Sequence, residues 1–135
     1  MKLGIVVSDT QKKITEQMLA LALQTAQQHK AQTQILHVPG SYDIPLAVKK
    51  LLEKKDIEGV VTLGVLIKGE TDHDALIAYT VANALTDLSL HYNKPVTLGI
   101  NGPNMTKEQA IERIKRAKKV TEACILMVKT HNSLI

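Results

Sequence analysis

The segment Gly69–Asp74 (GETDHD) contains the side chains best suited to acid–base chemistry and to anion binding. His73 is the candidate proton carrier, because an imidazole changes its charge near neutral pH and can move protons during a reaction. Thr71 and Asp74 have the spacing of a capping box, so we expect Thr71 to cap a helix that begins here. Free N–H groups at a helix N-terminus attract anions. The segment therefore predicts a phosphate site beside an imidazole, and the alternative is a capped helix start that binds nothing.

A second segment with several functional groups follows the turn at Pro39-Gly40. Ser41, Tyr42 and Asp43 would present a hydroxyl, an aromatic edge and a carboxylate at one place, which suits a polyhydroxylated or amide-rich ligand. The alternative is a plain tight turn in which Asp43 caps the next helix. The residues by themselves favour neither interpretation.

Arg113 is the candidate cation for a bound phosphate, because a guanidinium can hold phosphate with two hydrogen bonds at once. Its neighbours Glu112, Lys115 and Arg116 are also charged, so a solvated helix face is the alternative. We do not expect a metal among the acidic residues around His73. Adjacent side chains there would point in different directions, and no second histidine follows four residues later.

Composition and charge argue against several other classes of protein. The net charge is +4, but the lysines gather in two clusters expected on helix exteriors, so we do not expect nucleic-acid binding. Gly99–Gly102 fits the GXXG of an RNA-binding KH loop, yet the sequence after it does not continue that pattern.

Cys124 is the single cysteine, which excludes an internal disulfide and predicts a core residue. No apolar run resembles a membrane span or a signal peptide, so we expect no membrane partner and a cytoplasmic location.

Hydrophobic periodicity predicts four strands that alternate with four helices. The run GVVTLGVLI is apolar throughout, as strands buried on both faces of a parallel sheet are. The first helix is expected to bury one stripe whose members recur every three or four residues: Ile14, Met18, Leu21, Ala22 and Thr25. Strands are predicted at 3–7, 34–38, 59–67 and 95–100, and helices at about 12–30, 45–55, 73–91 and 107–131.

This βαβαβαβα order predicts a three-layer α/β/α sandwich around a four-stranded parallel sheet of the flavodoxin-like type, with right-handed βαβ crossovers. No linker or repeat interrupts it, so residues 1–135 are expected to form a single domain. Ligands of open parallel sheets bind outside the carboxyl ends of the strands. The site is therefore expected among the loops at 8–11, 38–44, 68–72 and 101–106.

Three longer segments carry a resemblance to a known family: VPGSYDIPLAVKKLL (38–52), VVTLGVLIKGETDHD (60–74) and KPVTLGINGPNMTKEQAIER (94–113). Their patterns VPG-x-[FY]-[DE]-x-P, LG-x-x-I-x-G-x-T-x-H and QA-x-ER, in this order and spacing, resemble the lumazine synthase family and particularly its archaeal-type members. The resemblance runs along nearly the whole chain. It implies a transferase of riboflavin biosynthesis that joins 5-amino-6-(D-ribitylamino)uracil to 3,4-dihydroxy-2-butanone 4-phosphate. Phosphate and water are released, and neither a cofactor nor a metal is needed.

The resemblance also assigns roles by position. His73 matches the histidine thought to shuttle protons, and Arg113 matches the cationic partner of the phosphate. The phosphate loop itself matches Gly69, Glu70 and Thr71. The segment that binds the ribityl chain of the pyrimidine substrate matches Ser41, Tyr42 and Asp43. The strand end whose backbone reads the edge of the pyrimidine ring matches Val65, Leu66 and Ile67. Leu98 falls at a hydrophobic wall that a neighbouring subunit donates.

Two positions depart from the family pattern. The family usually has Phe or Trp after the first strand, where the ring stacks on the pyrimidine, but this chain has Thr10. Thr10 therefore belongs to the expected substrate site, with about 1–3 kcal/mol of stacking missing. The family lysine that follows Arg113 could correspond to Lys118 or to Lys119.

The resemblance leaves two other functions to be tested. An archaeal-type riboflavin synthase would share this architecture, although the GETDH segment favours lumazine synthesis. A family member that holds flavin-like ligands without turnover is the other alternative, suggested by Thr10. The family forms homopentamers with sites between adjacent subunits, and some members build a 60-subunit shell from twelve pentamers. We therefore expect small-molecule substrates and at least a homopentamer, in which Arg113 reaches the site of its neighbour.

Overall fold

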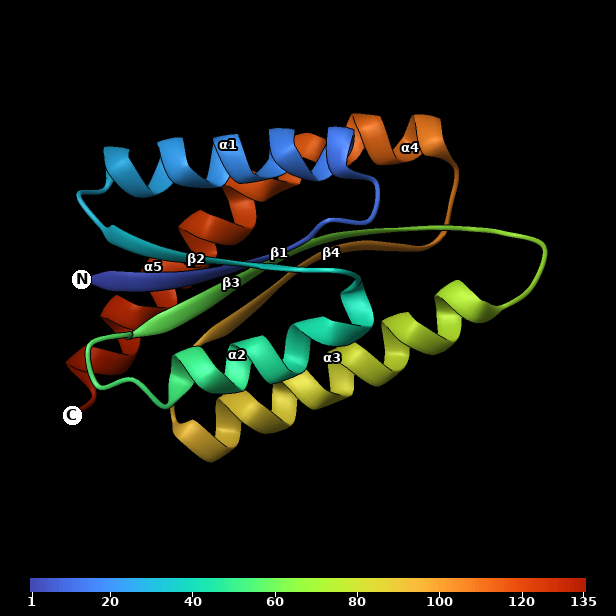
Figure 1. Ribbon diagram of the computed structural model, residues 1–135. Coiled ribbons are helices and arrows are strands. Elements are labelled where there is room, and N and C mark those ends of the chain that lie inside the picture. The colour runs from blue at the N-terminus through green and yellow to red at the C-terminus, as the bar shows by residue number, and fades with distance from the viewer.

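The computed structural model describes residues 1–135 and arranges them in three layers (Figure 1). The middle layer is a parallel sheet in the order β2-β1-β3-β4. Its strands are β1 (Lys2–Ser8), β2 (Gln32–Val38), β3 (Gly59–Ile67) and β4 (Val96–Met105). One face is covered by α1 (Lys12–Gln28), α4 (Lys107–Glu112) and α5 (Arg116–Ser133), and the other by α2 (Ile44–Leu52) and α3 (His73–Tyr92). The predicted α/β sandwich with a four-stranded parallel sheet is thus confirmed.

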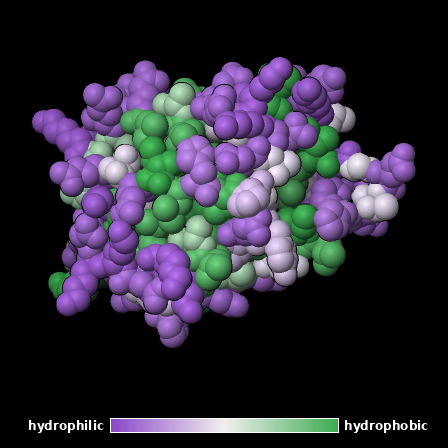
Figure 2. All heavy atoms as spheres, viewed as in Figure 1, coloured by the Kyte–Doolittle hydropathy of each residue, from purple (hydrophilic) through white to green (hydrophobic).

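Each face of the sheet has its own hydrophobic core, because successive side chains of a strand point to opposite faces. Leu3, Ile5 and Val7 pack with residues of α1 and α5, whereas Val6 and Val60 pack with residues of α2 and α3. In the view of Figure 2, hydrophobic residues gather across the middle of the molecule, and hydrophilic side chains cover the helices above and below. No helix has both the length and the apolar character that crossing a membrane requires.

The buried stripe of α1 largely follows the predicted periodicity. Ile14, Met18, Ala22 and Thr25 are buried, while Leu21 is only partly covered. The two lysine clusters, around Lys50 and Lys118, are exposed as expected.

Cys124 lies fully buried on α5, as predicted for a core residue. The helix packs so closely on β3 that a Cβ added to Gly59 would lie 2.9 Å from the Cys124 sulfur. Burial raises the pKa of the Cys124 thiol to about 12. The native protein therefore keeps this group as a neutral, unreactive thiol.

We expect Cys124 to resist thiol reagents such as 5,5′-dithiobis(2-nitrobenzoate) until the chain unfolds. Between pH 9.0, the ordinary pKa of this thiol, and about 12, the native state keeps the proton that the unfolded state loses. The free energy of unfolding should therefore fall with rising pH in that window, by about 1.4 kcal/mol per unit. Because other groups titrate there, the measurement is the difference between the wild type and Cys124→Ala in denaturant melts. Rapid labelling of the folded protein would contradict the prediction.

Strand β4 extends further than the sequence predicts. Residues 101–106 were expected to form a loop, since NGPN is rich in turn formers, but the strand continues to Met105. A register shift between Val65 and Ile67 absorbs these residues, after which Ile67 pairs with Met105. Gly102 has a φ of 114°, and a Cβ there would lie 2.5 Å from the Leu66 carbonyl oxygen. The glycine therefore marks a bulged strand with a close backbone contact.

The last predicted helix is also interrupted. In place of one helix over 107–131, a 3-10 turn at Arg113–Lys115 separates α4 from α5. Asn101, which is buried, donates its side-chain N–H to the Arg113 carbonyl at 3.2 Å. That carbonyl is thereby bonded to β4 at the point where the helix breaks. The interruption positions Arg113 at a bend.

Helix α2 ends at Leu52, three residues earlier than expected, and the side chain of Lys94 lies at its end. The Lys94 ammonium donates to the carbonyls of Leu52 at 3.0 Å and Lys54 at 2.8 Å. A lysine is a favourable partner for the negative end of a helix.

Candidate active site

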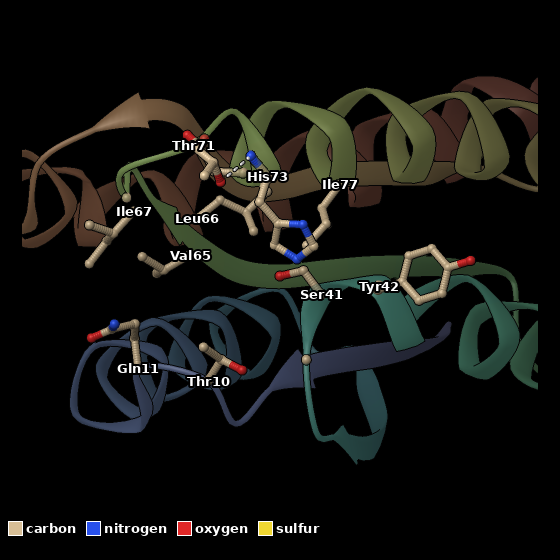
Figure 3. A pocket seen from close by; sticks show the side chains of 13 residues that line it. Thr10, Gln11, Ser41, Tyr42, Val65, Leu66, Ile67, Thr71, His73 and Ile77 are labelled. Carbon is tan, nitrogen blue, oxygen red and sulfur yellow. Dashed lines mark hydrogen bonds between the residues drawn. The ribbon is translucent and has the colours of Figure 1, made fainter.

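A cavity of about 370 Å³ opens at the carboxyl ends of β1 and β3 (Figure 3). The chain runs from β1 to β2 on one side and then crosses to β3 on the other side of β1. Such a reversal leaves a crevice at the carboxyl end of the sheet, where open α/β proteins bind ligands. The volume suits a small molecule. The strand order therefore accounts for the place of the cavity.

Two walls and a floor enclose the cavity, as Figure 3 shows. The end of β3 forms the floor with Val65, Leu66 and Ile67. The first residues of α3 form one wall, with the His73 ring turned inward. Opposite them lie side chains from the loops that follow β1 and β2, among them Thr10, Gln11, Ser41 and Tyr42.

Most of the residues singled out in the sequence line this one cavity: Thr10, Ser41, Tyr42, Val65, Leu66, Ile67, Gly69, Thr71 and His73. Four others do not line it: Asp43, Glu70, Leu98 and Arg113. Three lining residues were not predicted: Gln11, Gly40 and Ile77. Asp74 also lines the cavity, although the sequence suggested it only as a capping residue and as one member of a metal site that we did not expect. Ile77 could have been found, since it lies one helical turn after His73 and so on the same face of α3.

The start of α3 differs from the predicted capping box. The Thr71 hydroxyl accepts the backbone N–H of His73 at 3.3 Å, but the helix begins at His73 with no side-chain cap from Asp72. Asp74 does not complete the box, because its Oδ2 accepts the backbone N–H of Asn104 on β4 at 2.9 Å. That hydrogen bond holds the pKa of the Asp74 carboxyl below its usual value. The capping box is therefore wrong, and Asp74 links α3 to β4.

In the turn after β2, Ser41 and Tyr42 line the cavity, whereas Asp43 does not. Asp43 lies in a short 3-10 turn and accepts the backbone N–H of Gly40 at 3.1 Å. The carboxylate thus closes its own turn and does not cap α2. Ser41 is 5% exposed, and its hydroxyl oxygen is buried without a hydrogen-bond partner. A buried unpaired hydroxyl in a ligand-sized cavity is a group that a ligand can satisfy.

The family model for 6,7-dimethyl-8-ribityllumazine synthase matches residues 1–132. The chain belongs to this family. The 6,7-dimethyl-8-ribityllumazine synthase of Picrophilus torridus is 50% identical over 129 residues, which cover 95% of each chain. That of Methanopyrus kandleri is 48% identical over 95% of this chain and 92% of its own length. That of Methanocaldococcus jannaschii is 46% identical over 98% of this chain and 94% of its own. The resemblance in the sequence is thereby confirmed.

This member of the lumazine synthase family places Arg113 and Leu98 outside its own cavity. Arg113 is exposed on the 3-10 turn between α4 and α5. Leu98 lies on the edge strand β4, is 47% exposed, and lines a separate hollow beside the second half of α3. Gly69 has no neighbour within 4 Å of a Cβ added there, and the whole loop around it is exposed.

Thr10, for which the resemblance predicts the position of an aromatic ring in the family, is hydrogen-bonded to the next loop. Its hydroxyl donates to the Pro39 carbonyl at 2.9 Å, and its N–H donates to the Ser8 hydroxyl at 3.3 Å. The cavity wall here is a polar bridge between the loops after β1 and β2.

Proposed function

We propose that this chain is a 6,7-dimethyl-8-ribityllumazine synthase, a transferase of riboflavin biosynthesis. It joins 5-amino-6-(D-ribitylamino)uracil to 3,4-dihydroxy-2-butanone 4-phosphate and releases phosphate and water. The observation that carries the proposal is the family match along residues 1–132, joined by relatives of the same name that cover nearly all of the chain. These matches do not favour the riboflavin synthase alternative.

The proposed chemistry needs proton transfer and an anion site, and the start of α3 supports both. An imine forms between the amine and the ketone, phosphate leaves, and a second closure completes the ring. His73 faces the cavity and would carry protons in these steps. The backbone around Gly69 and Thr71 would hold the phosphate, joined by Arg113 of an adjacent subunit. Glu70 belongs to the same exposed loop.

The pyrimidine substrate would occupy the other half of the cavity. The end of β3 would read its ring edge through backbone groups of Val65, Leu66 and Ile67. The unpaired Ser41 hydroxyl supports the binding of a ribityl hydroxyl beside Tyr42. Asp43 would then contribute by fixing the turn, because its carboxylate already accepts the Gly40 N–H.

The same proposal includes a homopentamer, with sites between adjacent chains and Leu98 supplied to the neighbour's site. Apolar side chains left exposed in the single chain support it. Helix α3 buries only Asp74, Val81 and Leu85 among its 20 residues. Large hydrophobic side chains remain exposed on α2 and α3: Leu46, Leu76, Tyr79 and Leu90. The proposal is limited to the pentamer and does not include the 60-subunit shell. It also includes a cytoplasmic location.

The two-substrate assay tests the function. Purified protein mixed with both substrates should form a lumazine, detected by its own absorbance and fluorescence, faster than the uncatalysed mixture does. Lumazine supplied alone should not be converted to riboflavin, which separates the two synthases. Ligand binding in a calorimeter without product would instead support a non-catalytic member. Light scattering that finds a stable monomer would contradict the proposed assembly.

We expect Thr10→Phe to tighten binding of the pyrimidine substrate about 5- to 150-fold, the equivalent of about 1–3 kcal/mol of stacking. Thr10→Val is the matched control, because it also removes the hydroxyl bond to Pro39 but adds no ring. Calorimetry with the pyrimidine alone measures the difference between these two variants. Equal affinities would show that residue 10 does not face the ring.

A further inference from the structure

The loop that carries the proposed phosphate site is held at both of its ends by the last residues of β4. At its start, the Lys68 N–H donates to the Met105 carbonyl at 2.9 Å, and the Lys68 ammonium donates to Asn104 Oδ1 at 3.3 Å. At its end, the Asn104 N–H donates to Asp74 Oδ2 at 2.9 Å. One residue, Asn104, therefore contacts the chain on both sides of residues 69–73.

The backbone of Asn104 is shaped for this double contact. Its φ is 62°, in the left-handed region that asparagine and glycine enter more readily than other residues. It lies in the part of β4 beyond the bulge, where Ile67 pairs with Met105. The unpredicted extension of β4 thus directs the backbone N–H of Asn104 at the first turn of α3.

The Asp74 side chain is unusual for the first turn of a helix. It is 6% exposed, and its main hydrogen bond is to the Asn104 N–H on β4, ahead of the backbone N–H groups of its own first turn. Its Oδ1 is buried without a hydrogen-bond partner. Leaving one buried carboxylate oxygen unpaired costs free energy, and the hydrogen bond from the Asn104 N–H to the other oxygen offsets this cost. A direct contact with the phosphate would not offset it, because two anions repel each other.

We propose that Asp74 and Asn104 are positioning residues, which fix the start of α3 against β4 so that the phosphate loop and the His73 imidazole keep one separation. The inference rests on the proposed function. Its physical reason is that a displacement of about 1 Å in a catalytic arrangement can cost about a hundredfold in rate. Neither residue need touch the reacting atoms.

Steady-state kinetics with each substrate varied in turn tests the proposal. Asp74→Ala should lower kcat/KM for the phosphate substrate about ten- to hundredfold and leave the KM of the pyrimidine within about twofold. Asp74→Asn keeps an acceptor oxygen for the Asn104 N–H and should recover part of the loss. Asp56→Asn is the matched control, because it removes an exposed carboxylate that pairs with Lys2 at the opposite end of the sheet.

Variants of Asn104 test the same contact from the other side. Asn104→Gly keeps the positive φ and the N–H that Asp74 accepts, and loses only the acceptor for Lys68, so we expect a small effect. Asn104→Ala disfavours that φ and should approach the loss of Asp74→Ala. The comparison of Asn104→Gly with Asn104→Ala tests the proposal even when Asp74→Ala does not fold. Equal activities of these two variants would overturn the proposal.

Two other results would overturn it as well. One is a folded Asp74→Ala enzyme with wild-type kinetics for the phosphate substrate. The other is an equal rise in both KM values together with a lower melting temperature, which indicates a purely structural role. Calorimetry with inorganic phosphate separates this inference from the proposed function, since it needs no turnover. If the wild type forms no product, weaker phosphate binding by Asp74→Ala still supports the positioning role, and equal or absent binding by both proteins overturns it.

Discussion

Replacing His73 with alanine should lower kcat by about 10²- to 10⁴-fold, the usual contribution of a general acid–base group. The reason is geometric as well as chemical. The ring enters the cavity from the first turn of α3, next to the proposed phosphate loop and across from Ser41 (Figure 3). Activity above the uncatalysed rate should remain, because the site still holds the two substrates together.

The kinetics of three histidine variants make this test specific. His73→Gln can donate a hydrogen bond but cannot carry a proton at neutral pH, so it should be as slow as His73→Ala when proton transfer is the role. His29→Ala removes an exposed histidine at the end of α1 and should keep the wild-type rate. KM values should change little. A His73→Ala enzyme with the wild-type kcat would remove His73 from the mechanism.

The fold could be predicted because its signals are local and repeated. Apolar runs such as 59–67 identify strands buried on both faces, and the stripe on α1 identifies one buried helix face. The predicted ends of two helices were misplaced where a side chain from another part of the sequence bonds the backbone. The Asn101 side chain donates a hydrogen bond to the Arg113 carbonyl, and the Lys94 ammonium donates one to the Leu52 carbonyl at the end of α2. Hydrophobic periodicity does not reveal these hydrogen bonds, whose partners lie 12 and 42 residues apart in the sequence.

The site could be predicted only as a set of loops and family matches. The rule that ligands bind at the carboxyl ends of strands located the cavity, and the motifs supplied most of its lining. The hydrogen bond between Asp74 and Asn104 could not be predicted, because NGPN has the composition of a turn and no sequence pattern indicates the bulge in β4. Arg113 illustrates the opposite limit: the resemblance assigns it to the site, whereas its own chain places it outside the cavity.

Arg113→Ala should raise the KM of the phosphate substrate about ten- to hundredfold, as loss of a charge-assisted hydrogen bond does. The KM of the pyrimidine substrate should stay near the wild-type value. Arg116→Ala is the matched control, since this arginine is also exposed and lies one turn further along. An unchanged KM for the phosphate substrate in Arg113→Ala would show that the phosphate has another cation.

Mixing two defective proteins shows which subunit supplies Arg113. In a ring where each site combines His73 of one chain with Arg113 of the next, His73→Ala and Arg113→Ala chains that assemble together regenerate intact sites at some interfaces. Random mixing in equal amounts places both native residues in about a quarter of the sites, so about a quarter of the wild-type activity should return. If Arg113 instead served its own chain, every site would carry one defect and the mixture would only average the two variants. The exposed position of Arg113, outside its own cavity, is the reason to expect the recovery.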